Sequence, residues 1–386
     1  MIEGDNLDIV IKTAAGLEGV LAREVRALGG REVKTANRAV ICRGDMGFVI
    51  KANLWLRTAI RILVQLDRFQ IRDEENLYKK LKAMPWEQMF DVNKTLVVDA
   101  TVFSDQYRNS LFIAQKSKDA IVDRFREKVR KRPSVQLQDP DIRINVHIQQ
   151  RWVTVSLDSS GNSLHIRNYR KAVDKAPINE VLAAGILALS NWDPQLPLID
   201  AMCGSGTFLI EAALRASNIP ANIFRRDFAF KHWKAFDEDL YQLIFDKSLE
   251  KEKESLAPIL GFDKDPKVLL KARRNTKSAL MDEHIKFKAA DFLKWPEGIE
   301  LPPNGVLIMN PPYDMKFEAD IPQLYKGIGD TLKQHFSGYT AWIFTASAEG
   351  LKHLGLKPSQ KIKLKNAKLE SWLVRYDLYE GSRKHS

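Results

Sequence analysis

The four residues Asn310-Pro311-Pro312-Tyr313 carry the groups needed for chemistry on an amino group attached to a flat ring. They follow an apolar run, residues 305–309, of the kind that a buried parallel strand has. Neither proline has an N–H to donate, so the strand must end here in a rigid turn. The turn offers the Asn310 amide oxygen and the Pro311 carbonyl as acceptors, together with the Tyr313 ring. This set suits a base with an exocyclic NH2 group, although an ordinary Asn-Pro turn would have the same sequence.

A second stretch, residues 198–207, has the sequence of a short apolar strand that runs into a glycine-containing turn. Residues 208–216 are expected to form the helix that follows, which completes the first strand–helix unit of a doubly wound sheet. Gly204 and Gly206 would let the backbone approach a ligand closely, and the helix N-terminus favours a carboxylate or phosphate. Such sheets bind ligands outside the carboxyl ends of their strands, so this turn and Asn310 are expected at one edge.

Two more expected strands end at acidic residues. Residues 258–263 end at Asp263, whose carboxylate can accept hydrogen bonds from both hydroxyls of a ribose. Residues 285–290 lead to Asp291 and Phe292, where an acid can bond an adenine amino group while the ring packs on the base. A nicotinamide or flavin dinucleotide fits less well, because Leu209 stands where the fingerprint has its third glycine. A Walker phosphate loop is excluded, since no Gly-Lys-Ser/Thr follows the turn.

The composition bounds the class of protein. A chain of 386 residues has room for two or three domains. Two distant cysteines exclude a disulfide framework and favour a reducing cytoplasm. Seven histidines without ligand spacing predict no metal site, and no apolar run is long enough to span a bilayer.

Positive charge is concentrated in the first half of the chain. Of the formal net charge of +11, +8 falls in residues 1–180, which favours a polyanionic partner such as nucleic acid. Within this half, residues 110–132 are expected to form a helix with one apolar and one basic face. The basic face comprises Lys116, Lys118, Arg124, Arg126, Lys128, Arg130, Lys131 and Arg132. Only three acids interrupt it, and we interpret it as a nucleic-acid-binding face in preference to a solvated surface.

The order of the remaining elements predicts two small α/β domains before the glycine turn. Strands at 8–12, 38–42 and 61–69 alternate with helices at 17–28 and 48–59, which fits a ferredoxin-like sandwich. A helix at 77–84, a strand at 95–102, the basic helix and paired strands at 142–149 and 152–158 follow. Residues 1–158, opening with Gly16-Leu17-Glu18 and Leu21, resemble the ferredoxin-like segment plus THUMP domain of RNA-modifying enzymes. That resemblance implies RNA and not DNA.

The ordered strand ends Asp200, Asp263, Asp291 and Asn310 resemble the motifs of class I methyltransferases that use S-adenosylmethionine, over about residues 165–380. The resemblance implies an α/β fold in which a Rossmann-like methyltransferase domain follows the ferredoxin-like and THUMP parts. It assigns the cofactor to Asn179, Glu180, Asp200, Cys203, Gly204, Gly206, Thr207, Asp263, Asp291 and Phe292. It assigns catalysis to Asn310, Pro311, Pro312 and Tyr313. The basic connector adds Arg167 and Arg170 to the expected RNA contacts, and no metal is expected.

The whole chain resembles bacterial enzymes that methylate guanine N2 in large-subunit ribosomal RNA, often labelled putative N6-adenine-specific DNA methylases. The expected domains are residues 1–70 (ferredoxin-like), 71–158 (THUMP), 159–178 (connector) and 179–386 (methyltransferase). Residues 216–256 are expected to be an insertion into the minimal fold, and we expect one catalytic domain. Two alternatives stay open: an N6-adenine methyltransferase acting on RNA or DNA, and a catalytically silent RNA-binding protein.

Overall fold

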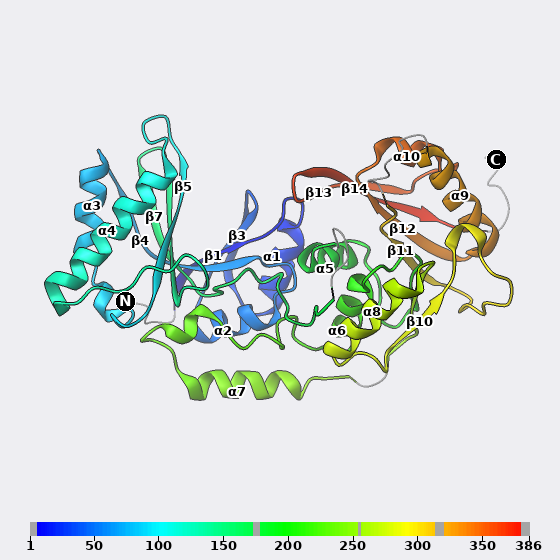
Figure 1. Ribbon diagram of the computed structural model, residues 1–386, viewed down its shortest axis with the longest axis horizontal. Helices are drawn as coiled ribbons and strands as arrows, with labels where there is room; N and C mark the ends of the chain where they lie inside the picture. Colours follow the sequence, from blue (N-terminus) through cyan, green and yellow to red (C-terminus); the bar gives the residue numbers. More distant parts are fainter. Residues whose placement is uncertain (1–5, 173–177, 254–255, 313–319, 380–386) are drawn as a thin grey trace. The chain divides into compact units, whose positions relative to one another are not determined.

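The computed structural model describes residues 6–172, 178–253, 256–312 and 320–379. The chain divides into two compact units (Figure 1). The N-terminal unit comprises Met1–Thr13, Leu21–Leu164 and Arg225–Lys247. The catalytic unit comprises Ala14–Val20, His165–Phe224 and Ser248–Ser386. No helix in the described parts of the chain is both long and apolar enough to cross a membrane.

One seven-stranded sheet runs through the N-terminal unit in the order β2-β3-β1-β4-β7-β6-β5. Its first half consists of β1 (Leu7–Lys12), α1 (Glu18–Ala27), β2 (Arg31–Ala36), β3 (Ala39–Gly44), α2 (Met46–Trp55) and β4 (Arg61–Gln70). Its second half consists of α3 (Glu74–Ala83), β5 (Leu96–Phe103), α4 (Ser110–Val129), β6 (Ile142–Gln149) and β7 (Trp152–Asp158). Strand β4 pairs with β1 on one side and β7 on the other, so the ferredoxin-like and THUMP-like halves share a sheet.

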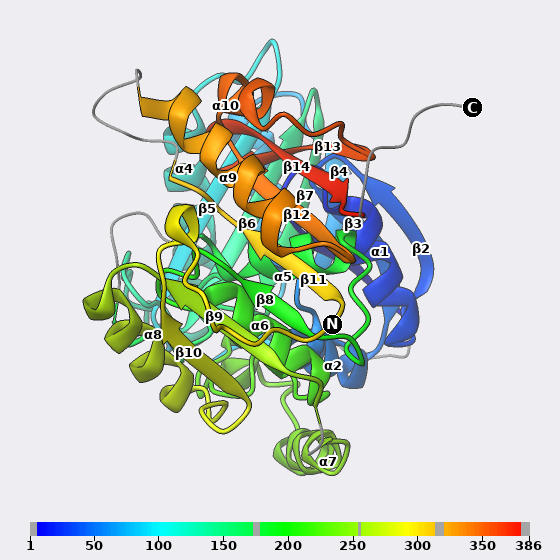
Figure 2. The same ribbon diagram turned by 90° about the vertical axis from the view of Figure 1, so that its right-hand side faces the viewer.

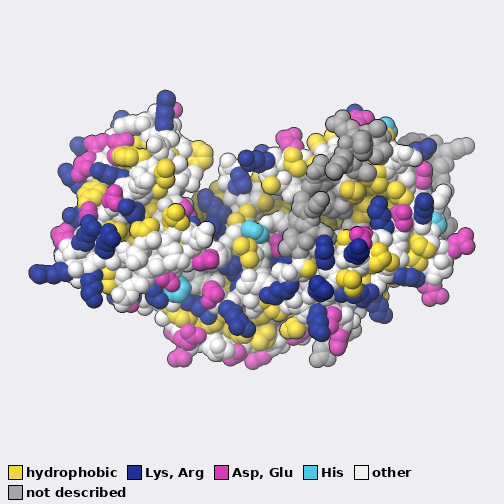
Figure 3. Space-filling model, viewed as in Figure 1, with side chains coloured by type: hydrophobic (Ala, Val, Ile, Leu, Met, Phe, Trp, Pro, Cys, Tyr) yellow, Lys and Arg dark blue, Asp and Glu magenta, His cyan; other side chains and the backbone are white. Residues whose placement is uncertain are grey.

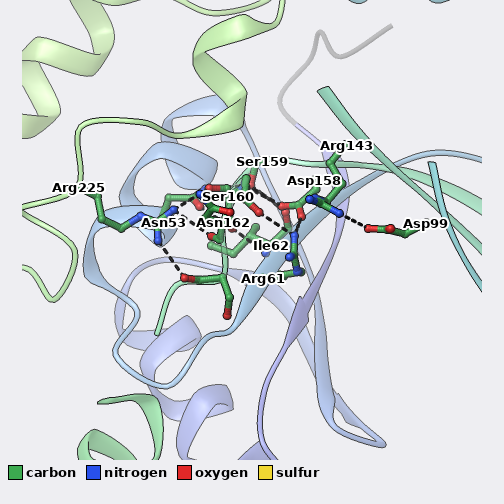
Figure 4. A network of polar contacts seen from close by, with 12 residues as sticks. Asn53, Arg61, Ile62, Asp99, Arg143, Asp158, Ser159, Ser160, Asn162 and Arg225 are labelled. Carbon is green, nitrogen blue, oxygen red and sulfur yellow. Dashed lines mark hydrogen bonds and ion pairs between the residues drawn. The ribbon is translucent and has the colours of Figure 1, made fainter. Parts of the chain in front are cut away.

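A buried polar network holds these halves together (Figure 4). Arg61 of β4 pairs with the buried carboxylate of Asp158, at the end of β7. The segment after β7 turns back, because the Ser160 amide donates to Asp158 at 2.8 Å and the Ser160 hydroxyl donates to Asn53 of α2 at 2.8 Å. The guanidinium of Arg225 in turn donates to the carbonyl of Ser160 at 3.1 Å. This bond attaches the inserted segment, which includes η2 (Ala229–His232) and most of α7 (Glu238–Leu249), to the N-terminal unit.

The catalytic unit has a second seven-stranded sheet, ordered β10-β9-β8-β11-β12-β14-β13 (Figure 2). Its strands are β8 (Leu198–Asp200), β9 (Ile259–Asp263), β10 (Ile285–Ala289), β11 (Gly305–Met309), β12 (Tyr339–Thr345), β13 (Gln360–Asn366) and β14 (Leu369–Asp377). Its helices are α5 (Glu180–Leu189), α6 (Thr207–Ala216), α8 (Pro266–Ser278), η3 (Phe292–Lys294), α9 (Asp320–His335) and α10 (Ala348–His353). The five neighbouring strands β10, β9, β8, β11 and β12 are parallel, and β14 is antiparallel to β12.

The chain order of this sheet sets the position of a ligand site. From β8 the chain proceeds to β9 and β10 on one side, and then crosses to β11 on the other. The strand order therefore reverses between β8 and β11, and ligands of open α/β sheets bind at such a switch point. All five residues of β11 are buried, as expected of a central parallel strand.

A short segment from near the N-terminus, residues 14–20, belongs to the catalytic unit. Leu17 is fully buried there, and a Cβ added to Gly185 of α5 would lie 2.4 Å from its Cδ1 atom. The missing side chain at Gly185 thus makes room for Leu17. A Cβ added to Gly16 would lie 2.9 Å from the side chain of Leu364 in β13, so this segment also packs on β13.

Candidate active site

The glycine turn after β8 is fixed by bonds to the neighbouring strand β9. The Cys203 amide donates to the Phe262 carbonyl at 2.9 Å, and the Gly204 amide donates to Oδ2 of Asp263 at 3.1 Å. Gly204 and Gly206 have φ values of 53° and 83°, in the left-handed region that favours glycine. A Cβ added to Gly204 would meet nothing within 4 Å. The turn therefore presents open backbone on which a ligand can lie.

Two ionisable groups beneath this turn are held neutral by their surroundings. Asp200 is buried, and burial together with the nearby Asp263 carboxylate raises its pKa to about 8. The only bond to its carboxylate among the described residues is a weak one at 3.3 Å, from the Met202 amide. Burial, Asp200 and Asp263 also raise the pKa of the Cys203 thiol, so this cysteine is not an activated nucleophile. A cationic ligand group at the switch point would favour the ionised form of Asp200 and pair with it.

Arg170 is hydrogen-bonded to predicted cofactor residues at the N-termini of both α5 and α6. Its guanidinium donates to the Glu180 carboxylate at 2.9 Å, to the Ile178 carbonyl at 3.1 Å and to the Thr207 hydroxyl at 3.0 Å. The Asn179 side chain accepts from two amides and caps α5. A hollow of about 400 Å³ lies beside this cluster. With Nε and Nη2 bonded in this way, Arg170 organises the site, and its role as an RNA contact stays a prediction.

Arg167 is placed differently from the sequence prediction. Its side chain is fully buried, 3.5 Å from Glu211, and donates to Asn222 at 2.9 Å. The Tyr169 hydroxyl donates to the same Glu211 carboxylate at 3.0 Å. A guanidinium enclosed in this way cannot reach an RNA phosphate unless the packing opens. We therefore correct its predicted role to that of a buried ion-pair partner.

Asn275 of α8 is a site residue that the sequence analysis missed. It is buried, and its amide oxygen accepts from the backbone amides of Lys171 and Ala172, both at 2.9 Å. Its amide nitrogen donates to the carbonyls of Ala172 at 3.0 Å and Ser205 at 3.2 Å. One side chain thus ties the connector to the glycine turn. No local pattern marks it, because its partners come from two other segments.

The residues after β10 are partly corrected. Oδ1 of Asp291 accepts from the Leu293 amide at 3.0 Å and caps η3. Phe292 is only 2% exposed, and its ring packs against Trp295 and Phe336, with centroids 5.8 and 5.6 Å away. The Phe292 ring therefore faces the core, so the expectation that it packs on a base is wrong for this conformation.

Asn310 follows β11 at the switch point. Its Oδ1 atom is buried and has no hydrogen-bond partner among the residues that the structure describes. Such an orphaned acceptor costs free energy unless a ligand satisfies it, so the site fits a donor such as an amino group. Pro311 is buried and Pro312 is exposed. Tyr313, the fourth residue of the motif, lies outside the described residues.

The basic face of α4 divides into two sets. Lys116 pairs with Glu75, Lys118 with Asp119, Arg126 with Asp123, and Arg124 makes two bonds to Glu87. The other four are exposed at the C-terminal end of the helix and just beyond it, with no ion pair among the described residues: Lys128, Arg130, Lys131 and Arg132. Figure 3 shows Lys and Arg side chains over this part of the molecule. Free positive charge is therefore concentrated at one end of the predicted face.

No group of three or more His, Cys, Asp or Glu side chains placed to hold a metal ion occurs in the described ranges. The glycine turn, Asp263, Asp291 and Asn310 each lie at or just after the end of a strand in the parallel part of one sheet. All of them belong to the catalytic unit.

Three family models match the chain. An RMKL-like methyltransferase domain matches residues 167–375, a THUMP domain matches residues 72–158, and an RlmL ferredoxin-like domain matches residues 8–63. Among curated proteins, the putative RNA methyltransferase slr0064 of Synechocystis is 38% identical over 370 residues, 95% of each chain. The ribosomal RNA large subunit methyltransferase K/L of Syntrophotalea carbinolica is 36% identical over 95% of this chain, which spans 53% of that longer protein.

A solved structure is similar over nearly the whole chain. The putative methyltransferase SMU.472, complexed with SAH, has a TM-score of 0.86 and 30% identity, with 98% of this chain and 100% of that chain covered. A predicted N6-adenine-specific DNA methylase from Listeria monocytogenes has a TM-score of 0.85, 28% identity and coverage of 97% and 96%.

Fold, site and comparisons define a class I methyltransferase with a THUMP domain. The chain belongs to the RMKL-like methyltransferase family. The predicted resemblance, the α/β fold class and S-adenosylmethionine as the cofactor are thereby confirmed. The roles assigned to single residues remain proposals.

Proposed function

We propose that this methyltransferase transfers a methyl group from S-adenosylmethionine to guanine N2 of large-subunit ribosomal RNA in the cytoplasm. The observation that carries the proposal is the buried Oδ1 of Asn310 at the switch point, for which the described residues offer no hydrogen-bond partner. The THUMP match supports RNA as the substrate, and the relative named for the ribosomal large subunit supports ribosomal RNA.

The residues of the glycine turn and the next two strand ends would hold the cofactor. The open backbone at Gly204 gives it room, Asp263 would accept from its ribose, and Asp291 would meet the adenine. Asp200 and the α5 N-terminus, with Asn179 and Glu180, would meet its methionine end. When bound, the cofactor would supply an electrophilic methyl group, because the sulfonium sulfur that carries it leaves as the neutral thioether of S-adenosylhomocysteine.

The motif after β11 would hold the target base. A guanine drawn out of its RNA stack would place its N2 amino group between the Asn310 amide oxygen and the Pro311 carbonyl. When these two oxygens accept hydrogen bonds from both N2 hydrogens, the nitrogen can become pyramidal and direct its lone pair at the methyl group. Tyr313 would stack on the ring. After it gains the methyl group, the base nitrogen would lose its surplus proton to solvent, so no strong general base is needed and positioning supplies the acceleration.

Nucleoside analysis tests the product. Large-subunit ribosomal RNA from cells lacking the gene, incubated with the purified protein and cofactor, is expected to gain N2-methylguanosine. Protein-poor particles should be better substrates than assembled ones, because the base must leave its stack. A gain of N6-methyladenosine alone would establish the adenine alternative, which the same amino-group pocket would serve. If the RNA gains no methylated nucleoside while the cofactor still binds, the remaining alternative is a catalytically silent RNA-binding protein.

A further inference from the structure

The pairing registers of the catalytic sheet define one row of residues across all seven strands. Ile308 of β11 is aligned through Asp200 and Gly261 with Phe287 of β10 on one side. On the other side it is aligned through Trp342 and Arg375 with Gln360 of β13. Both edge strands thus lie three strands from β11, about 14 Å at the usual spacing of neighbouring strands.

The hairpin of β13 and β14 extends past this row on the side of the candidate active site. Strand β13 is antiparallel to β14, which is antiparallel to β12, so β13 runs in the same direction as β11. Asn310 is two residues beyond the row. On β13, Lys361, Lys363 and Lys365 are one, three and five residues beyond it. Lys363 and Lys365 therefore lie farther out from the carboxyl edge than Asn310, and Lys361 lies one residue short of it.

Lys361, Lys363 and Lys365 form one face of β13, which we call the lysine face. All three are exposed, and alternation places them on the side opposite Ile362 and Leu364. Leu364 is 1% exposed, because residues 14–20 pack on that other side. The lysine face is thus the uncovered face of an edge strand, with its lysines about 6.7 Å apart.

Among the described residues, the lysine face has an aromatic neighbour and an acidic one. The Nζ atom of Lys361 lies 5.0 Å from the centroid of the Trp372 ring of β14. Lys363 pairs with Glu370 at 2.8 Å, but both side chains are more than half exposed, so this pair contributes little stability. Proteins that bind single-stranded nucleic acid combine positive charge, which follows the backbone, with aromatic rings on which bases stack.

We propose that the lysine face of β13 binds the RNA backbone that flanks the target nucleotide. The inference rests on the proposed function, in which the cofactor lies over β8, β9 and β10, on Asp263 and Asp291. The carboxyl edge from β11 to β13 is then the side left for RNA. A strand with its target base on Asn310 passes the lysine face within a few nucleotides, and positive charge there matches its phosphates.

The opposite edge of the sheet provides a matched control. On β10, Lys288 is one residue beyond the same row, and Lys286 is one residue before it. Both are exposed lysines of an edge strand at the same lateral distance from β11. The double variants K363Q/K365Q and K286Q/K288Q each remove two charges, while the first retains Lys361 on Trp372.

The test compares the salt dependence of binding to large-subunit ribosomal RNA from cells lacking the gene. Each single-strand phosphate that a variant no longer neutralises lowers the slope by about 0.7, so K363Q/K365Q should show a slope lower by about 1.4. Over a fourfold increase in salt, wild-type affinity should then fall about sevenfold more than that of this variant. The K286Q/K288Q slope should equal that of wild type. Affinity for S-adenosylhomocysteine should be unchanged in both variants, which verifies folding.

Three outcomes would overturn the proposal. Equal slopes for all three proteins would leave the lysines as protection of an edge strand against aggregation. Equal reductions of the slope in both variants would indicate only diffuse attraction by net charge. Reduced RNA binding with unchanged methyl incorporation would place the lysine face away from the productive complex. If wild-type protein methylates none of this RNA, the proposed function fails, and this is seen before any variant is compared.

Discussion

The backbone amide of Gly204 donates a hydrogen bond to Oδ2 of Asp263 at 3.1 Å, and this bond joins the glycine turn to the end of the next strand. The other carboxylate oxygen accepts from the Asp265 amide at 3.0 Å. The plane of the carboxylate is therefore set by backbone donors, and each oxygen keeps a lone pair for a ligand hydroxyl. The position of this acceptor and the shape of the turn are coupled.

Asp263→Ala is expected to weaken S-adenosylhomocysteine binding tenfold or more, because hydrogen bonds to a charged acceptor contribute about 1.5–3 kcal/mol. The matched control is Asp265→Ala. Asp265 caps α8 through the Lys267 amide at 2.8 Å, so its loss should lower the melting temperature and leave affinity nearly unchanged. Calorimetry on the three proteins measures both effects. Equal affinities for Asp263→Ala and wild type would make Asp263 a purely structural acid.

Asn310→Ala should separate binding from transfer. We expect cofactor affinity to stay close to that of wild type, and methyl incorporation to fall about 10²–10³-fold, as when one preorganised polar group is removed from a transition state. Asn310→Asp, which retains an oxygen acceptor at the same position, should keep more activity than the alanine variant. Single-turnover assays at saturating cofactor measure this. An active alanine variant would remove Asn310 from the mechanism.

Local patterns predicted the strands and the polar residues at their ends, because apolar runs and strand-terminating turns are properties of neighbouring residues. Strand β2 was missed, since Arg31–Ala36 has no buried residue and no apolar alternation. Arg167 and Asn275 were misread or missed for another reason. A charge or an amide has the same appearance in sequence whether it is exposed or enclosed by distant segments.

The predicted domain boundaries at residues 70, 158 and 178 stay predictions, but the compact units show why such boundaries are hard to infer. Residues 14–20 pack in the catalytic unit, and residues 225–247 pack in the N-terminal unit. Both segments thus pack in the unit that does not contain their neighbours in sequence, and this depends on contacts between segments far apart in the chain. The complementarity of Leu17 and Gly185 is one example, and no local pattern records it.

Asp200 makes the stability of the cofactor-free protein depend on pH. Its pKa is about 8 when folded, against an ordinary value of about 3.9, so between these values the folded state binds more protons. Its contribution is fully present below the lower value and is lost as pH rises through the higher one. The melting temperature of Asp200→Asn, minus that of wild type, should therefore increase from about pH 5 to about pH 8. A constant difference would mean that Asp200 titrates normally.

Asn275→Asp tests the tie between connector and glycine turn. The substitution keeps the oxygen that accepts from Lys171 and Ala172, but removes the donor to the Ala172 and Ser205 carbonyls. Two carbonyls near a new carboxylate should repel it, so we expect weaker cofactor binding and a raised KM for the cofactor at nearly unchanged kcat. Titration and steady-state kinetics measure this. A lower melting temperature with both constants unchanged would limit Asn275 to a structural role.

The four exposed bases at the end of α4 provide the last prediction. Replacing Lys128, Arg130, Lys131 and Arg132 by alanine should weaken binding to large-subunit ribosomal RNA. It should also reduce the salt slope by up to about 3–4, because each phosphate that a base neutralises adds roughly 0.7–0.9 to that slope.

The control replaces the four paired bases of the same helix, Lys116, Lys118, Arg124 and Arg126, by glutamine. Their charge is already balanced by Glu75, Asp119, Glu87 and Asp123, so the slope should change much less. Cofactor affinity should be unaffected in both, because α4 belongs to the N-terminal unit. Filter binding between about 50 and 200 mM salt measures the slopes. An unchanged slope for the four-alanine variant would make this end of α4 a solvated surface, and equal reductions in both variants would contradict the division of the helix into free and paired charges.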